Sequence, residues 1–138
     1  MRIMAIDYGD AHTGIAISDP TGFLAGFTTT INAYRPEVVA DQVESLAREH
    51  SVEELVLGYP KNMDGSLGPR AEKAQAMGEL LKEVTGLPLT LWDERRTTID
   101  AHQILMGAGK NAKKRKKTVD AVAATLILEG YLTYKKSR

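Results

Sequence analysis

The sequence predicts a single α/β domain in which helices cover the faces of a mixed sheet, and two patterns support this. Three strand-like runs near the N-terminus are joined by short turns, which is typical of an antiparallel meander. Strand-like and helical segments then alternate to the end of the chain, which is typical of parallel strands joined by crossover helices. A chain of 138 residues with 43% hydrophobic content can form one compact core and is short for two. We therefore expect one domain that spans residues 1–138.

The first three elements are expected to be strands. The segment "RIMAIDY" (2–8) is apolar at successive positions, as is typical of a central strand covered on both faces. The strands "TGIAISD" (13–19) and "FLAGFTTT" (23–30) follow, and the "DPTG" between them has Pro and Gly at the second and fourth positions of a turn. Because the connections are short, we expect neighbouring strands to be antiparallel.

The following elements alternate between helix and strand. Residues 36–50 place valine, leucine and alanine at helical spacing, which predicts an amphipathic helix. The strand "ELVLG" (54–58), a helix over 69–84 that begins at Pro69, and the strand "LPLTLW" (87–92) come next.

Two more helices are predicted after residue 92. "TTIDAHQILMGAG" (97–109) opens with Thr97 and Asp100 at capping-box spacing and closes on glycines. "TVDAVAATLILEGYL" (118–132) is the last helix, with Thr118 as its expected N-cap.

Composition narrows the class of protein. The chain has no cysteine, which excludes disulfides and thiolate metal sites. Only four apolar residues in a row precede Asp7, too few for a signal-peptide core, and no run approaches the roughly 20 apolar residues of a membrane span. We therefore expect a soluble, cytoplasmic protein with no membrane partner.

The formal net charge is zero, but the charge is distributed unevenly. Residues 1–109 carry 9 Lys and Arg against 16 Asp and Glu, while residues 110–138 carry 9 against 2. We define the basic cluster as the five residues Lys113, Lys114, Arg115, Lys116 and Lys117. Such a segment on an acidic body is typical of a polyanion-binding protein or of a solvated tail, and the charge pattern leaves both open.

Acidic residues end two predicted strands and begin one predicted helix. Asp7 ends the first strand, and Asp93 and Glu94 follow the last one. Asp120 lies in the first turn of the last predicted helix. Each acid has a structural explanation by itself, as a turn former, a surface ion pair or a partner of the helix dipole. Ligands gather beyond the carboxyl ends of parallel strands in such sheets, so we expect the acids to converge there.

Converging carboxylates would repel one another and raise each other's pKa values, and a divalent cation would relieve this repulsion. Oxygen ligands, the absence of cysteine and only three scattered histidines favour Mg²⁺ or Mn²⁺ over zinc. Two such ions about 3.5 to 4 Å apart can activate a water and stabilise the leaving oxygen of a phosphodiester. The implied substrate is a phosphate ester, and the basic cluster would bring a polyanion to the metal.

The chain resembles the YqgF/RuvX family in four segments that occur in order: "AIDYGDAHTGIAISD", "LVLGYPKNMDGSLGPRAEKA", "LWDERRTT" and "KKTVDAVAATLIL". These are ribonuclease H-like proteins described as Holliday-junction resolvases and as nucleases that process the precursor of 16S ribosomal RNA. The resemblance covers nearly the whole chain. It implies a five-stranded sheet with the first strand central, three antiparallel strands followed by two parallel ones, and helices on both faces.

The resemblance also implies a function and a set of site residues. It implies a metal-dependent nuclease that acts on structured nucleic acid, either an rRNA precursor or branched DNA. Asp7, Glu94 and Asp120 would be the catalytic, metal-binding carboxylates, with Asp93 as a further candidate. The sequence does not decide between RNA and DNA, nor between a monomer and a homodimer, although symmetric cutting of a junction would require two sites.

The segment "GYPKNMDGSLGPR" (58–70) is a long glycine-rich loop that carries Lys61 and Arg70. We interpret it as a lid over substrate or as a flexible connection, and the two basic residues as substrate contacts.

Three further residues lie near the expected site. His12 stands where many relatives have a basic residue, and we expect it to be a strand or turn residue. Tyr8 and Tyr59 flank the site and could stack on a base, although we expect Tyr8 to pack in the core because it points away from Asp7.

Two other functions remain open at this stage. The Asp-x-Gly after a first strand also occurs in actin-like ATPases and sugar kinases, but those folds need two related domains. A nucleic-acid-binding adaptor without catalysis, acting in transcription or ribosome assembly, is the other alternative.

Overall fold

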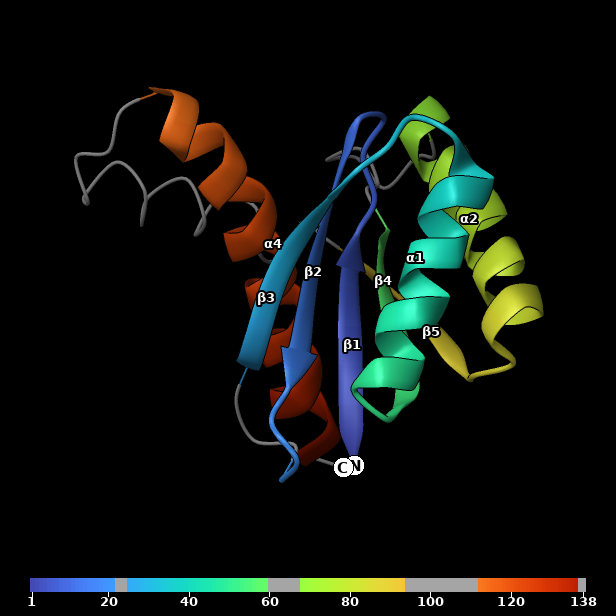
Figure 1. Ribbon diagram of the computed structural model, residues 1–138. Coiled ribbons are helices and arrows are strands. Elements are labelled where there is room, and N and C mark those ends of the chain that lie inside the picture. Colours follow the sequence, from blue (N-terminus) through green and yellow to red (C-terminus); the bar gives the residue numbers. More distant parts are fainter. Residues whose placement is uncertain (22–24, 60–67, 94–111, 137–138) are drawn as a thin grey trace.

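The computed structural model describes residues 1–21, 25–59, 68–93 and 112–136 (Figure 1). Within these residues the centre of the molecule is a five-stranded sheet in the order β3-β2-β1-β4-β5. The strands are β1 (Arg2–Asp7), β2 (His12–Ser18), β3 (Ala25–Asn32), β4 (Val52–Tyr59) and β5 (Leu89–Asp93). The β1–β2 and β2–β3 pairs are antiparallel, whereas β1–β4 and β4–β5 are parallel. The expected mixed sheet with the first strand at its centre is confirmed.

Helices cover both faces of this sheet (Figure 1). α1 (Pro36–Glu49) and α2 (Pro69–Thr85) lie on one face, and α4 (Ala112–Lys136) lies on the other. α1 and α2 both begin at a proline, because its fixed φ suits the first helical position and its missing N–H costs nothing there. α2 ends at Gly86, which has a left-handed φ of 70° and donates its amide to the Lys82 carbonyl.

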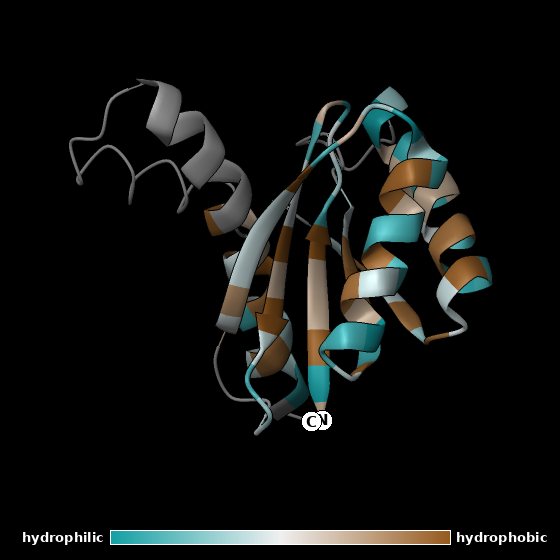
Figure 2. Cartoon of the chain, in the orientation of Figure 1, coloured by the Kyte–Doolittle hydropathy of each residue, from teal (hydrophilic) through white to brown (hydrophobic). Residues whose placement is uncertain are grey.

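Alternation along the strands separates two hydrophobic cores. Met4 and Ile6 of β1 pack in the core beneath α1 and α2, whereas Ile3 and Ala5 pack in the core beneath α4. Figure 2 shows hydrophobic residues along the strands and hydrophilic patches on the helices. Because both faces of β1 are buried, its sequence has no polar alternation, as a central strand requires.

The structure corrects the prediction for the last helix. α4 begins at Ala112, so the basic cluster belongs to its first turns and Thr118 is not its N-cap. Asp120 therefore lies well inside the helix and not in its first turn. Lys and Arg are strong helix formers, so the helix extends through the charged run to a start that the threonine did not mark. The helix predicted over 97–109 lies outside the described residues.

Candidate active site

Asp7 is the last residue of the central strand and is partly buried. It is in register with Gly14 of β2. Ile3 and Ala5, which precede Asp7 at every second position, pack beneath α4. Because side chains alternate along a strand, Asp7 belongs to the face of the sheet that α4 covers.

The carboxyl ends of β1, β4 and β5 lie at one edge of the sheet because these strands are parallel. Asp93 ends β5 in register with Tyr59 of β4. Its neighbour Trp92 packs beneath α4, so alternation places Asp93 on the opposite face. Asp7 and Asp93 share an edge of the sheet but not a face, which makes Asp93 a poor partner for Asp7. Glu94 lies outside the described residues.

α4 runs along the face to which Asp7 belongs. Its N-terminal half lies at the end of the sheet where β1 ends, and its C-terminus returns to the end where β1 begins (Figure 1). Ala124, Ile127 and Leu128 of α4 are fully buried against the sheet. Asp120 and the basic cluster belong to the N-terminal half of α4 and therefore lie toward the carboxyl ends of the parallel strands.

The other expected substrate contacts are only partly described. Arg70 is exposed in the first turn of α2, while Lys61 and the rest of the loop over 60–67 lie outside the described residues. His12 is a strand residue, as expected, and its Nδ1 lies 2.7 Å from Oδ1 of Asn32 on β3. The substrate contacts assigned to Lys61, Arg70 and the basic cluster remain predictions.

The two tyrosines have different environments. Tyr59 is buried against Ala71 and Ala74, and its hydroxyl accepts a hydrogen bond from Nε2 of Gln75 at 2.7 Å. It packs in the interior, which does not fit the stacking considered for it. Tyr8 packs only partly against the core, as expected for its face, and lines a pocket beside β1.

The environment of Tyr8 raises its pKa above the usual value. Burial of the phenol is the main cause, and the nearby carboxylate of Asp10 adds to it, while Lys73 acts in the opposite direction. Asp10 and Lys73 line the same pocket as Tyr8, as does Tyr34, which precedes α1. None of these three stood out in the sequence, although an aromatic residue two positions before a helix-starting proline was a usable signal for Tyr34.

Neither a group of side chains that could hold a metal ion nor a membrane-spanning helix occurs among the described residues. In that part of the chain, no three His, Asp or Glu side chains are grouped to hold a metal ion. Glu94 and the side chain of Asp120, which are two of the three expected ligands, lie outside this description. Of the helices described, none is long and apolar enough to cross a membrane.

Residues 1–134 match the family model of RuvX, described as a Holliday junction resolvase. A protein of Halothermothrix orenii named "Putative pre-16S rRNA nuclease" is 46% identical over 134 residues, which are 97% of this chain and 96% of that one. A protein of the same name from Clostridium botulinum (strain Alaska E43) is 45% identical over 132 residues, covering 96% of each chain.

The fold resembles that of T. thermophilus RuvC in complex with a Holliday junction substrate. The TM-score is 0.66 at 14% identity, over 99% of this chain and 96% of that one. At this identity the likeness concerns the fold alone, and it confirms the expected ribonuclease H-like architecture.

Proposed function

The chain belongs to the RuvX family of nucleases, and on this basis we propose that Asp7, Glu94 and Asp120 hold Mg²⁺ or Mn²⁺ for the hydrolysis of phosphodiester bonds. The observation that carries the proposal is the position of Asp7. It ends the central strand, it is partly buried, and it belongs to the face that α4 covers. A carboxylate there stands at the edge of the sheet where ligands of such folds gather.

The other two carboxylates are assigned by their positions in the chain. Glu94 directly follows Asp93 at the end of β5, and strand alternation disfavours Asp93 itself. Asp120 precedes the buried residues Ala124 and Ile127 of α4 by four and seven residues, a spacing that repeats along one face of a helix. The assignments of Glu94 and Asp120 therefore rest on their positions in the chain and on membership of the RuvX family.

The donor chemistry fits a hard divalent cation. The three candidates offer carboxylate oxygens only, and the chain has no cysteine that would favour a softer metal. When bound, such an ion lowers the pKa of a coordinated water and offsets the negative charge that develops on the phosphate oxygens. The basic cluster at the start of α4 would attract and hold the polyanion beside the carboxylates.

We propose structured nucleic acid as the substrate and the precursor of 16S rRNA as the first to test, because relatives with 45 and 46% identity carry that name. A four-way DNA junction is the second, because it is the substrate in the family description. The protein would act in the cytoplasm as a monomer or a homodimer.

The proposal is tested with labelled precursor rRNA, single-stranded RNA, duplex DNA and junction DNA, each incubated with Mg²⁺, Mn²⁺ or a chelator. We expect metal-dependent cleavage of at least one structured substrate, and loss of that cleavage in Asp7→Asn. Asp41→Asn is the matched control, because Asp41 is exposed on α1, which lies on the other face of the sheet. Binding without cleavage under every condition would overturn the nuclease assignment in favour of an adaptor.

A further inference from the structure

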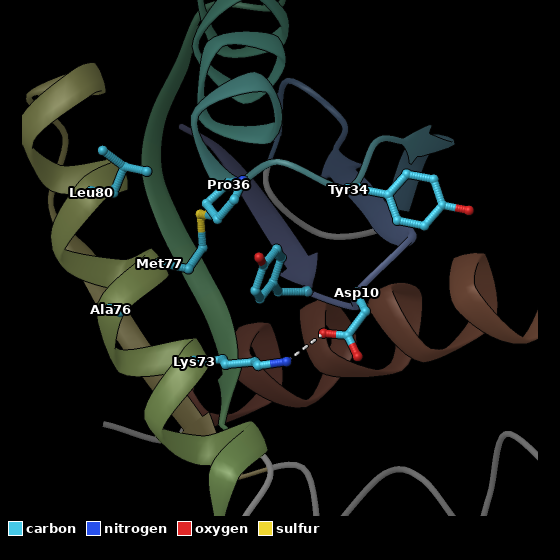
Figure 3. Close-up of a pocket in the computed structure, with 8 residues that line it drawn as sticks. Asp10, Tyr34, Pro36, Lys73, Ala76, Met77 and Leu80 are labelled. Atoms are coloured by element: carbon cyan, nitrogen blue, oxygen red, sulfur yellow. Dashed lines mark hydrogen bonds and ion pairs between the residues drawn. The ribbon is translucent and has the colours of Figure 1, made fainter.

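We propose that a pocket on the α1/α2 face of the sheet, beside Asp7, binds an unpaired nucleobase of the substrate strand; this inference rests on the proposed nuclease function. The pocket lies between the end of β1, the start of α1 and the exposed side of α2 (Figure 3). Its volume is about 450 Å³. Ligand pockets in proteins measure roughly 300 to 1,000 Å³, so a base and part of its sugar can be held there.

The pocket and the proposed metal site share one edge of the sheet. Tyr8, which lines the pocket, directly follows Asp7 in the chain. Adjacent strand residues point to opposite faces, so Asp7 and Tyr8 are on the two sides of the edge formed by the carboxyl ends of β1, β4 and β5. A nucleic-acid strand that crosses this edge with one phosphate near Asp7 can place a neighbouring base beside Tyr8.

The pocket interior is mainly apolar. Met77 and Leu80 of α2 and Pro36 of α1 line it together with the Tyr8 ring (Figure 3). The phenol ring of a tyrosine carries no charge at physiological pH, so it offers a neutral surface for stacking. Aromatic side chains stack on bases of any sequence, because every base has a π-face.

Tyr34 lies at the rim and is 81% exposed. Figure 3 shows its ring directed away from Pro36 and Met77. An exposed side chain changes rotamer within nanoseconds, so the ring can turn over a base that has entered the pocket. A large aromatic side chain held in solvent beside an apolar pocket is typical of a recognition residue.

One ion pair lies at the rim of the pocket. Nζ of Lys73 lies 3.0 Å from Oδ1 of Asp10 (Figure 3), and the two side chains are 58% and 79% exposed. An ion pair this exposed contributes little to stability, so Lys73 can exchange Asp10 for a substrate phosphate at small cost. Asp10 would then be available to accept a hydrogen bond from an exocyclic amine of the base.

The remaining charges near the pocket do not exclude a polyanion. Glu37 follows Pro36, which lines the pocket, but the guanidinium of Arg35 pairs with it at 2.9 Å. Arg70 lies in the first turn of α2, the helix that carries Lys73, and is exposed. The pocket thus combines an apolar, aromatic interior with the basic side chain of Lys73 at its rim, which matches a base attached to a phosphodiester strand.

The test uses the full chain in a chelating buffer, which separates binding from cleavage. Single-stranded oligonucleotides carry 2-aminopurine at successive positions, and affinity is measured by anisotropy while 2-aminopurine fluorescence reports stacking. We expect one register in which the fluorescence is quenched. Tyr34→Ala should weaken single-strand binding by about tenfold and relieve the quenching, whereas Tyr34→Phe should retain both. Binding of fully paired duplex should not change, because its bases are not free to enter the pocket.

The role of the Lys73 charge is tested with Lys73→Gln, and Lys82→Gln on the same helix is the matched control. Lys73→Gln should weaken binding by a few fold and reduce the steepness of the salt dependence by about 0.7 in log–log slope. Lys82→Gln makes the same change in an exposed lysine that pairs with Glu79 away from this pocket, and it should leave affinity and slope unchanged.

Three results would overturn the inference. If Tyr34→Ala and Lys73→Gln bind single strands as the wild type does, while the wild type cleaves nucleic acid in Mg²⁺, the pocket assignment is wrong and the nuclease proposal stands. If a nucleoside monophosphate displaces the oligonucleotide at equal concentration, the pocket is a free-nucleotide site. If the wild type neither binds nor cleaves any substrate, the proposed function fails together with this inference.

Discussion

Replacement by alanine of two glycines inside helices is expected to change the free energy of unfolding in opposite directions. In the interior of a helix, alanine is favoured over glycine by about 1 kcal/mol, because glycine loses more backbone entropy on folding. The outcome at each position then depends on the atoms that the new methyl group would meet. Gly78 lies in α2 and faces the core that α1 and α2 cover, and Gly130 lies in α4 beside Trp92.

A methyl group at Gly78 would make ordinary van der Waals contacts. Its nearest neighbours would be side-chain atoms of Leu57 and Leu89, each at 3.5 Å. Burial of one methyl group contributes a further gain of up to about 0.8 kcal/mol. We expect Gly78→Ala to raise the free energy of unfolding by about 1 to 1.5 kcal/mol.

A methyl group at Gly130 would lie too close to the Trp92 ring. The new carbon would be 3.2 Å from Cζ2 and 3.6 Å from Cε2 and Nε1. Trp92 is a rigid ring that also contacts Tyr131 and Tyr134, so it cannot move aside freely. Overpacking costs roughly 1 to 3 kcal/mol, which exceeds the gain in helix propensity. We expect Gly130→Ala to lower the free energy of unfolding by about 1 kcal/mol.

Urea unfolding followed by far-UV circular dichroism measures both variants against the wild type. For a chain of this length, 1 kcal/mol corresponds to a shift in Tm of about 3 to 4 °C. The m-values should not change, because neither substitution alters the surface exposed on unfolding appreciably. An increase in stability for Gly130→Ala that equals the increase for Gly78→Ala would refute the close packing of α4 against Trp92.

Four other predictions follow from the site and its surroundings. Asp7→Asn should abolish metal-dependent cleavage without lowering stability, since it removes a charge from the acidic site; wild-type rates in the purified variant would contradict the metal assignment. Millimolar Mg²⁺ should raise the wild-type Tm in calorimetry because it binds the folded site, and the gain should shrink at low pH as the carboxylates protonate; an unchanged Tm at neutral pH counts against a preformed site. If the basic cluster neutralises about four phosphates, raising salt from 50 to 200 mM should weaken duplex binding roughly a hundredfold. Conversion of the cluster to Gln should make binding less salt-dependent with little change in maximal rate, and a salt dependence equal to that of the wild type would identify the cluster as a solvated helix end. The pKa of Tyr131 is raised, mainly by burial and also by its hydrogen bond to Glu54, so the free energy of unfolding should be constant below about pH 10 and fall above it, where the tyrosine of the unfolded chain ionises first. The fall should be shallower in Tyr131→Phe, and identical urea midpoints between pH 8 and 11 would contradict this prediction.

The interactions of Glu54 illustrate what sequence reading could not supply. The Glu54 carboxylate accepts hydrogen bonds from the Tyr131 hydroxyl and from Nζ of Lys135, the latter at 2.7 Å. This contact joins β4 to the last turns of α4, which are far away in the chain. Nothing in the local pattern around Glu54 distinguishes it from its exposed neighbour Glu53, because pairing depends on where α4 docks.

Local pattern was sufficient for the elements and their order. The uninterrupted apolar run of β1 predicted a central strand, and the prolines at positions 36 and 69 predicted the starts of α1 and α2. These features depend on the backbone preferences of each residue and on the spacing of apolar residues, which repeats about every 2.0 residues in a strand and every 3.6 in a helix. Both can be read from residues that are neighbours in the sequence. The start of α4 was misjudged, because a good capping residue was given more weight than the helix propensity of the lysines before it.

By itself the sequence determined that an α/β fold places Asp7 at the end of its first strand, with acidic residues at a second strand end and on the last helix. The tertiary structure decided which face of the sheet each side chain occupies, and so excluded Asp93 from the side of Asp7. It also decided that Tyr8, Tyr34 and Lys73 meet around one pocket. The physical reason is that these residues lie just after β1, just before α1 and within α2. Burial of Met4, Ile6, Val43 and Met77 in a common core brings these segments together, and no local pattern encodes that packing.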